Sequence, residues 1–184
     1  MGHKDAYKIL AVETDDDLET FLGRVLDDLK DNGRGEHPFF MPHSPDKPWP
    51  LAEKRTAFRR ELSLDLGQVG WRRAWIAWDD QHRAAGHCDL RSAPHELCLH
   101  RCLLGIGVHR SHRRRGLGRQ LLQHAIEWAR REPSLHWLDL EFLGGNLGAE
   151  RLYRQLGFQE TGRAPDFFRI RGQEIENIQM TLRL

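Results

Sequence analysis

The feature that most constrains the fold is an apolar strand, a basic turn and an amphipathic helix that follow one another without a spacer. Residues 103–108 read L-L-G-I-G-V, and residues 109–119 then carry five arginines and two glycines. Over residues 116–131 apolar side chains recur at helical spacing until a proline ends the pattern. Because a second apolar run follows at 135–143, the segment predicts two adjacent parallel strands joined by a right-handed helical crossover.

The turn between this strand and this helix has the properties of an anion-binding site. The first backbone N–H groups of a helix have no partner within the helix and lie at the positive end of its dipole. Gly116 and Gly118 let an anion approach the backbone closely, and arginine suits phosphate. The same glycines are equally consistent with close packing of the helix. The segment has neither the Lys-Ser/Thr of a P-loop nor a complete Gly-x-Gly-x-x-Gly.

The remaining patterns predict a single α/β domain of the α+β type over residues 1–184. We expect a mixed, mostly antiparallel sheet of about seven strands flanked by about four helices. The predicted strands are 7–12, 71–78, 84–91, 96–108, 135–143 and two within 158–184, and the predicted helices are 18–29, 51–66, 116–131 and 147–156. A loop at 33–50 holds five prolines and several aromatic residues, which favours a packed, shaped loop over a free linker.

Composition excludes several classes of protein. The 184 residues carry 28 Lys and Arg against 27 Asp and Glu, so a net charge of +1 argues against a general nucleic-acid coat. Three cysteines do not form a disulfide framework, and no secretory leader or membrane-spanning apolar run is visible. We therefore expect a cytoplasmic protein that binds neither membrane nor nucleic acid.

Two blocks of the sequence match the pattern of one family. Arg113-Arg114-Arg115-Gly116-Leu117-Gly118, five residues after Val108, resembles the [QR]-x-x-G-x-[GA] loop of the GCN5-related N-acetyltransferases (GNAT). The stretch 146–158, with Asn146, Tyr153 and a Gly-Phe pair at its end, is similar to the family's other block. These blocks lie in residues 103–131, the predicted acyl-CoA pyrophosphate loop and helix, and 135–158, the predicted second block.

The resemblance implies acetyl-CoA as co-substrate and a direct transfer of its acetyl group to an amine, without a nucleophilic residue. It also implies splayed central parallel strands, with the pantetheine arm paired to the open edge of the strand that ends at Val108. Tyr153 corresponds to the tyrosine that protonates the departing thiolate. The residues implied to bind the cofactor are Ile106, Val108, Arg113, Arg114, Arg115, Gly116, Leu117, Gly118, Arg119, Asn146 and Tyr153. Asn146 is equally suited to capping the helix that follows it.

The group that takes the proton from the amine is not specified by the resemblance. Some relatives carry a glutamate at the position of Cys102. If residues 96–108 form one strand, Glu96, His100 and Cys102 share a face, so we expect His100 as a candidate base. Glu141, on the strand before Asn146, is a second candidate. Cysteines 98 and 102 and their neighbouring histidines are spread over ~13 Å of strand, so no metal site is expected.

The acceptor and the assembly are left open. In the family the acceptor lies over the first two helices and their connection, here residues 22–58 with the loop 33–50 and its aromatic residues. Peptide N-termini and small-molecule amines both fit, and homodimerisation is left open. A non-catalytic acyl-CoA sensor of the same fold is the main alternative. An RNA-binding protein is disfavoured because the arginine cluster has no interleaved aromatic residues.

Overall fold

The computed structural model describes residues 7–35, 38–44 and 46–184. Its strands and helices follow one another along the chain in the predicted order. The strands are β1 (Lys8–Ala11), β2 (Arg72–Trp78), β3 (Ala84–Ser92), β4 (Arg101–Val108), β5 (Trp137–Leu143), β6 (Gln159–Ile170) and β7 (Gln173–Arg183). The α-helices are α1 (Asp15–Leu29), α2 (Leu51–Leu62), α3 (Leu117–Arg131) and α4 (Leu147–Gln155), with 3₁₀ turns η1 (Glu96–Cys98) and η2 (Arg110–His112).

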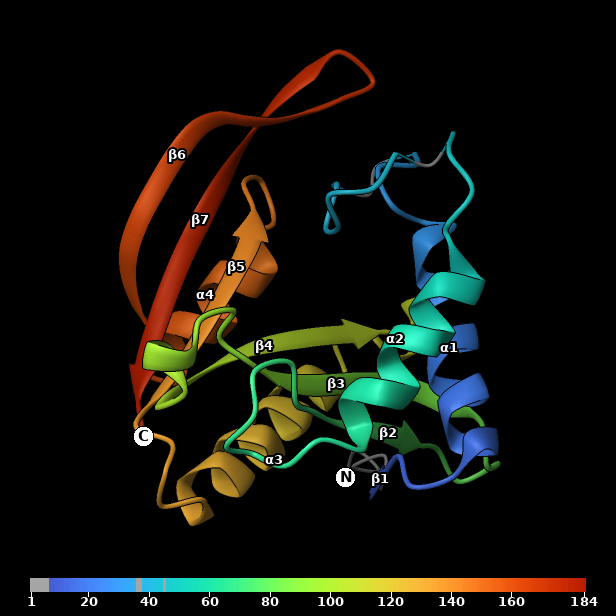
Figure 1. The fold of residues 1–184 in the computed structure, drawn as a ribbon. Helices are drawn as coiled ribbons and strands as arrows, with labels where there is room; N and C mark the ends of the chain where they lie inside the picture. The colour runs from blue at the N-terminus through green and yellow to red at the C-terminus, as the bar shows by residue number, and fades with distance from the viewer. Residues whose placement is uncertain (1–6, 36–37, 45) are drawn as a thin grey trace, which may run out of the picture.

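The strands form one mixed sheet in the order β1-β2-β3-β4-β5-β7-β6. Only β4 and β5 are parallel, and α3 connects them, which confirms the predicted crossover. Helices α1 and α2 cover one face of β2 and β3, while α3 and α4 pack on the other face (Figure 1). The seven-stranded mixed sheet with four helices confirms the expected fold class.

The parallel strands separate soon after they begin. Strand β4 pairs with β5 only through residues 101–103, although it pairs with β3 along residues 102–108. From Leu104 to Val108 the edge of β4 that faces β5 therefore has no neighbouring strand among the described residues. This is the splay that the resemblance implied, and it leaves a row of backbone groups available to a ligand.

Local sequence explains where the helices flanking this splay begin. Thr14 and Asp17 form a reciprocal capping box at the start of α1, and Asp15, Asp16 and Asp17 lie in its first turn. Helix α3 begins after Gly116, whose φ of +84° lies in the left-handed region that favours glycine. Both helices then present a stripe of apolar side chains to the sheet.

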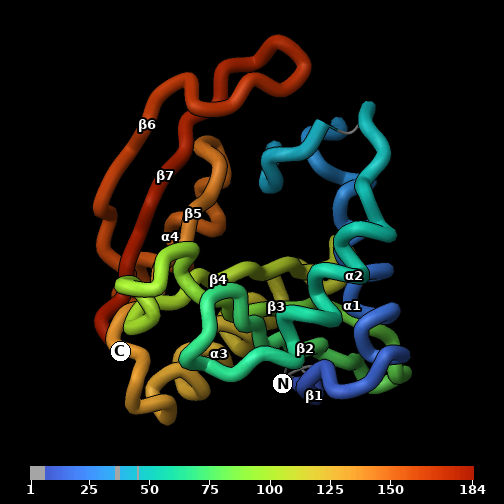
Figure 2. Tube along the Cα trace, in the orientation of Figure 1, coloured from blue at the N-terminus to red at the C-terminus, as the bar shows by residue number. Residues whose placement is uncertain are grey.

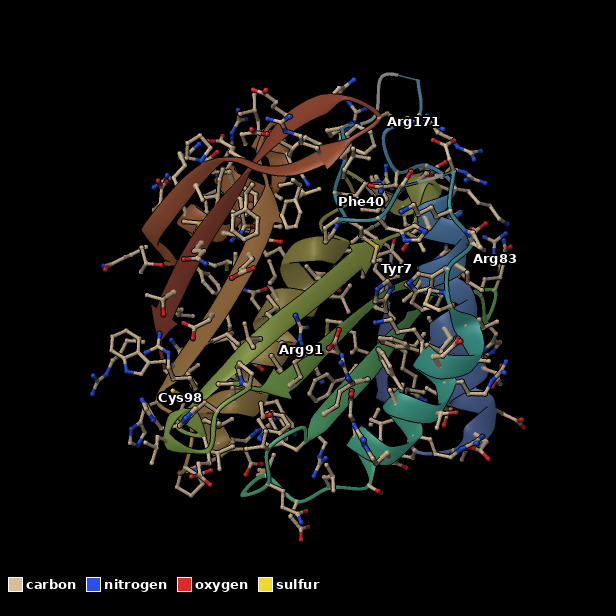
Figure 3. All side chains as sticks on the ribbon, turned by 45° about the horizontal axis from the view of Figure 1, so that its top comes forward. Tyr7, Phe40, Arg83, Arg91, Cys98 and Arg171 are labelled. Atoms are coloured by element: carbon tan, nitrogen blue, oxygen red, sulfur yellow. The ribbon has the colours of Figure 1, made fainter. Side chains whose placement is uncertain are left out.

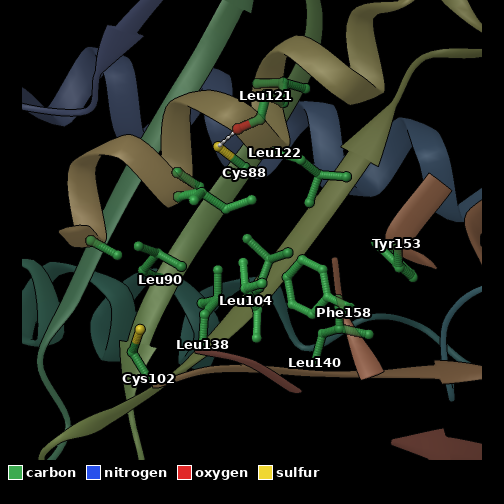
Figure 4. Packing of buried hydrophobic residues seen from close by; sticks show 14 of the residues in the cluster. Cys88, Leu90, Cys102, Leu104, Leu121, Leu122, Leu138, Leu140, Tyr153 and Phe158 are labelled. Carbon is green, nitrogen blue, oxygen red and sulfur yellow. Dashed lines mark hydrogen bonds between the residues drawn. The ribbon is translucent and has the colours of Figure 1, made fainter. Parts of the chain in front are cut away.

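The main core lies between the sheet and helices α3 and α4. It joins Leu121 and Leu122 of α3 to Leu104 of β4 and Leu138 of β5, all nearly inaccessible to solvent (Figure 4). Two of the three cysteines are buried within it. The Cys88 thiol donates to the Leu121 carbonyl at 3.8 Å, and burial raises the pKa of both the Cys88 and the Cys102 thiols. These thiols are therefore protonated structural groups.

The prediction of one continuous strand over residues 96–108 is wrong at its beginning. The side chain of His95 accepts a hydrogen bond from the Leu97 N–H and caps a single 3₁₀ turn, so β4 begins only at Arg101. Glu96, Cys98 and His100 consequently do not extend the face that Cys102 begins. The second helix also ends four residues earlier than predicted, at Leu62.

The loop at 33–50 is held in place by two buried side chains. Asn32, fully buried, donates to the carbonyls of Met41 and His43 and accepts from the N–H groups of Phe40 and Met41. Phe39 packs in a separate apolar cluster with Leu143 at the end of β5, Ile170 at the end of β6 and Ile175 of β7. The loop therefore reaches the tip of the β6–β7 hairpin, as the course of the chain shows (Figure 2). The predicted packed loop is confirmed for its described residues.

Candidate active site

The open edge of β4 borders a cavity of about 560 Å³. Its wall combines the C-terminal end of β4, the start of α3, the first two turns of α4 and two residues of the 33–50 loop. The lining residues are Asp28, Pro38, Phe40, Ile106, Gly107, Val108, Arg113, Arg114, Gly116, Gly118, Arg119, Leu122, Asn146, Gly148, Ala149, Leu152 and Tyr153. The structure thus brings together most of the residues predicted to bind the cofactor; Arg115 and Leu117 do not line the cavity.

The helix start at one end of this cavity is formed by a tight turn. Arg114 at φ +62° and Gly116 at φ +84° turn the chain tightly into α3. A side-chain carbon on Gly116 would meet nothing within 4 Å, whereas one on Gly118 would lie 3.3 Å from Leu152 of α4. Gly116 is therefore required by its backbone conformation and Gly118 by helix packing. Both leave the N–H groups of the first turn accessible from the cavity.

The arginines around this turn differ in what they contact. Arg113 donates to the Val108 carbonyl at 3.0 Å and lies over the Phe40 ring, so it holds the turn against the loop. Arg119 donates to the Gln155 side chain of α4, and Arg110 pairs at 3.0 Å with Asp31, which lies two residues after the end of α1. Arg114 is exposed and lines the cavity. A charge-assisted contact to an anionic ligand is therefore most accessible to Arg114 and, once released from Gln155, Arg119.

The second block places Asn146 and Tyr153 on the wall opposite β4. The Asn146 side-chain oxygen accepts from the Ala149 N–H at 3.3 Å and caps α4, which leaves its NH₂ group to donate to a ligand. Tyr153 is buried between the rings of Phe142 and Phe158, and burial raises its pKa to about 12. Its phenol is therefore protonated at neutral pH.

The two predicted bases do not line the cavity. His100 lies just before β4, next to η1; Figure 3 shows Cys98 of η1 and Phe40 of the cavity wall at opposite ends of β4. Cys102, the position of the glutamate of some relatives, is buried in the core. Glu141 is exposed on the α1 face of β5, where Gln179 and Asn177 of β7 donate to its carboxylate at 2.9 and 3.3 Å.

Sequence reasoning missed two polar residues next to the cavity. Asp28, near the end of α1, lines the cavity and is only 3% exposed, and His87 of β3 lies beside it with 8% exposure. Their sequence signal is weak, because a polar residue in an amphipathic helix or an alternating strand is usually solvent-facing. The glycines of β4 are the only hint, since they leave room on one face of the sheet for large polar neighbours.

Two features are absent from the part of the chain that the structure describes. Among residues 7–35, 38–44 and 46–184, no group of three or more His, Cys, Asp and Glu side chains is arranged to hold a metal ion. Within those residues no helix is long and apolar enough to cross a membrane. The cytoplasmic location stays a prediction.

A strand with an open edge leads here into a helix whose N-terminus faces a cavity, an α/β arrangement that suits an extended ligand with an anionic end. The chain matches the acetyltransferase (GNAT) family over residues 37–158, about two thirds of its length, and it belongs to that family. It is an N-acetyltransferase, as the sequence resemblance implied.

Individual relatives agree with this assignment. The chain is 29% identical over 133 residues to the N-alpha-acetyltransferase RimI of Mycobacterium tuberculosis, covering 70% of this chain and 73% of the relative. The fold is similar to that of a ribosomal-protein-alanine N-acetyltransferase from Brucella melitensis, with a TM-score of 0.76 at 21% identity and coverage of 95% and 99%. It is also similar to yncA from Salmonella typhimurium, solved with its cofactor acetyl-CoA, with a TM-score of 0.79 at 18% identity and coverage of 97% and 94%.

Proposed function

We propose that this protein transfers the acetyl group of acetyl-CoA directly to a primary amine. The observation that carries the proposal is the unpaired edge of β4, residues 104–108, which opens onto a cavity with a helix N-terminus at one end and the Tyr153 phenol in its wall. Acetyl-CoA has a pyrophosphate for the helix start and an amide-containing arm for the strand edge, so the residues present fit it.

The residues proposed to hold acetyl-CoA fall into two groups. The N–H groups from Arg113 to Gly118 bind the pyrophosphate, with charge from Arg114, Arg115 and Arg119. The backbone of Ile106 and Val108 pairs with the pantetheine arm, and the Asn146 amide orients it. When bound, acetyl-CoA supplies the acetyl group as an activated thioester. The cavity volume of about 560 Å³ and its open form suit such an extended ligand.

The protein's own groups have three tasks in the proposed transfer. Tyr153, protonated and buried, donates its proton to the sulfur that leaves as the carbon–sulfur bond breaks. Another group accepts the proton that the amine loses as the carbon–nitrogen bond forms. The loop and α1 place the amine over β4. No thiol serves as a nucleophile in this scheme: Cys88 and Cys102 are buried and protonated, and Cys98 does not line the cavity.

The acceptor is proposed as a peptide N-terminus or a small-molecule amine. The name of the RimI relative gives N-alpha-acetylation as that protein's activity, which supports testing peptides with a free N-terminal amine. Polyamines, aminoglycosides and small metabolite amines belong in the same panel. These amines differ in charge and size, so their relative rates would show which acceptors the cavity favours.

The test measures binding and turnover separately. Calorimetry with acetyl-CoA should show binding at micromolar concentrations, and free-thiol release with the amine panel should show turnover. Absence of acetyl-CoA binding at tens of micromolar would overturn both the proposed enzyme and the alternative sensor of acyl-CoA. Binding without thiol release for any amine would favour the sensor.

A further inference from the structure

A buried cluster of charged and polar groups lies between α1 and the sheet, next to the end of β4. It contains Arg24 and Asp28 of α1 and His87 of β3. The cluster covers Gly107 of β4 on the side of the sheet that α1 packs against. A side-chain carbon on Gly107 would lie 2.9 Å from both His87 Nε2 and Asp28 Oδ2. The imidazole and the carboxylate therefore occupy the space that a side chain at this position of β4 would fill.

Hydrogen bonding within this cluster is incomplete. Asp28 Oδ1 accepts from Arg24 Nη2 at 3.0 Å, but Asp28 Oδ2, His87 Nδ1 and Arg24 Nε are buried with no hydrogen-bond partner among the described residues. His87 Nδ1 lies 3.7 Å from Asp28 Oδ2, about 0.7 Å beyond an ordinary N–H···O hydrogen bond. Burying such groups without full hydrogen bonding costs stability, so their presence beside a cavity points to a chemical role.

The surroundings of His87 decide its protonation. Asp28 and Arg24 face it from α1, Asp89 lies two residues away on β3, and β4 opposes it with Gly107, which has no side chain. The ring of Phe21 packs on the imidazole edge-to-face at 5.0 Å. Burial lowers the pKa of His87, although the two carboxylates act in the opposite direction. The imidazole is therefore neutral at pH 7 and has a lone pair to accept a proton.

We propose that His87 accepts the proton of the acceptor amine and that Asp28 orients the imidazole, so that the two form the base of the transfer. This inference rests on the proposed function and deepens it. An N–H bond of the substrate ammonium breaks, the proton moves to His87 Nε2, and the freed lone pair forms the carbon–nitrogen bond. As the carbon–sulfur bond breaks, the nitrogen loses a second proton, which replaces the one that Tyr153 gives to sulfur. The imidazolium then releases the proton to solvent.

The geometry favours this pair over the two bases expected from sequence. Nε2 lies over Gly107, whose neighbours Ile106 and Val108 are the proposed partners of the pantetheine arm. His100, by contrast, precedes β4 at the end farthest from the cavity. Glu141 is exposed across the splay, and its two oxygens accept from Gln179 and Asn177. Only the Asp28–His87 pair combines burial, an unpaired acceptor and contact with the cavity wall.

The test is the pH dependence of kcat at saturating acceptor for a set of single variants. His87→Gln keeps the approximate size of the side chain but cannot accept a proton near neutrality. We expect kcat at pH 7 to fall by at least about 10²-fold and the inflection on the acidic side of the parent profile to disappear. The acetyl-CoA Kd should stay within about twofold of the parent, which also shows that the variant is folded.

Asp28→Asn provides a second, independent measurement. Removing the negative charge beside the imidazole disfavours the imidazolium, so the inflection should move to lower pH rather than vanish. His124→Gln is the matched control, because His124 is also partly buried with a lowered pKa but contacts Trp75 on the far face of the sheet. It should keep the parent profile.

The outcomes separate this inference from the proposed function. If His87→Gln keeps the inflection, or if Glu141→Gln or His100→Gln removes it instead, the assignment of His87 is wrong while the acetyltransferase stands. If the parent binds acetyl-CoA but releases no thiol with any amine, the proposed function is wrong, and the role of His87 falls with it. If Asp28→Asn leaves the inflection in place, Asp28 does not position His87.

Discussion

Tyr153 is the residue proposed to protonate the leaving thiolate. Its hydroxyl belongs to a buried ring in the cavity wall, so Tyr153→Phe removes one oxygen with little change in packing. We expect kcat to fall by roughly 10²-fold or more, with the acetyl-CoA Kd little changed. Tyr7→Phe is the matched control, since Tyr7 contacts His112 and does not line this cavity. An unchanged kcat in Tyr153→Phe would falsify the role of general acid.

The same burial predicts how the reaction responds to alkaline pH. Because burial raises the pKa of Tyr153 to about 12, the phenol stays protonated well above neutrality. The kcat profile should therefore show no basic limb from this residue up to about pH 10. A basic limb between neutrality and that pH that is lost in Tyr153→Phe would contradict this assignment.

At the scale of single residues, the sequence indicated that Asn146 and Tyr153 share one wall of the cavity but gave no sign of Asp28 and His87. Asn146 and Tyr153 lie on one helix, so their spacing along the chain already places them on one wall. Asp28 and His87 are 59 positions apart in sequence, and only the packing of α1 on the sheet brings them to Gly107. Without that packing, neither residue differs from an ordinary polar residue.

At the scale of elements, the start of α3 tests whether an anion binds the helix N-terminus. Gly118→Glu adds a negative charge beside the proposed pyrophosphate, and we expect acetyl-CoA binding to be abolished. A side chain here also presses on Leu152, so Gly118→Ala is the control for packing. Calorimetry should show clearly weaker binding for Gly118→Glu than for Gly118→Ala. Equal affinities would place the anion elsewhere.

The beginning of β4 shows why the elements were predicted better than their ends. Residues 96–100 alternate in a way that suits a strand, yet Leu97 is 77% exposed and His95 caps a 3₁₀ turn. One hydrogen bond from a cap outweighs a short alternating pattern. The crossover from β4 through α3 to β5 was predictable because three long periodic segments follow one another directly.

At the scale of the whole molecule, Phe39 joins the 33–50 loop to the ends of β5, β6 and β7, which are distant in sequence. Its neighbours Pro38 and Phe40 line the cavity, while its own ring packs on Leu143, Ile170 and Ile175. We expect Phe39→Ala to loosen this wall and raise the acceptor KM by about tenfold, equivalent to about 1.4 kcal/mol. The acetyl-CoA Kd should change little, because β4 and α3 are untouched.

An ion pair on the surface joins the same loop to the β6–β7 hairpin, and it can be compared with the packing of Phe39. Arg171 at the hairpin tip pairs with Asp46 of the loop at 2.5 Å, but both side chains are largely in solvent. Solvent-exposed ion pairs contribute little, so Arg171→Ala should change the acceptor KM less than Phe39→Ala does. The reverse order would show that charge, rather than apolar packing, holds the loop in place.

The strand order also affects how the protein is completed during synthesis. Strand β7 inserts between β5 and β6, so β5 has an open edge until β7 has been synthesised. A nascent or truncated chain ending before Gln173 already contains the whole pyrophosphate loop and α4. It lacks β7, whose Gln179 donates to the Glu141 carboxylate and whose Ile175 packs with Phe39. The wall proposed to face the acceptor is therefore completed after the pyrophosphate loop.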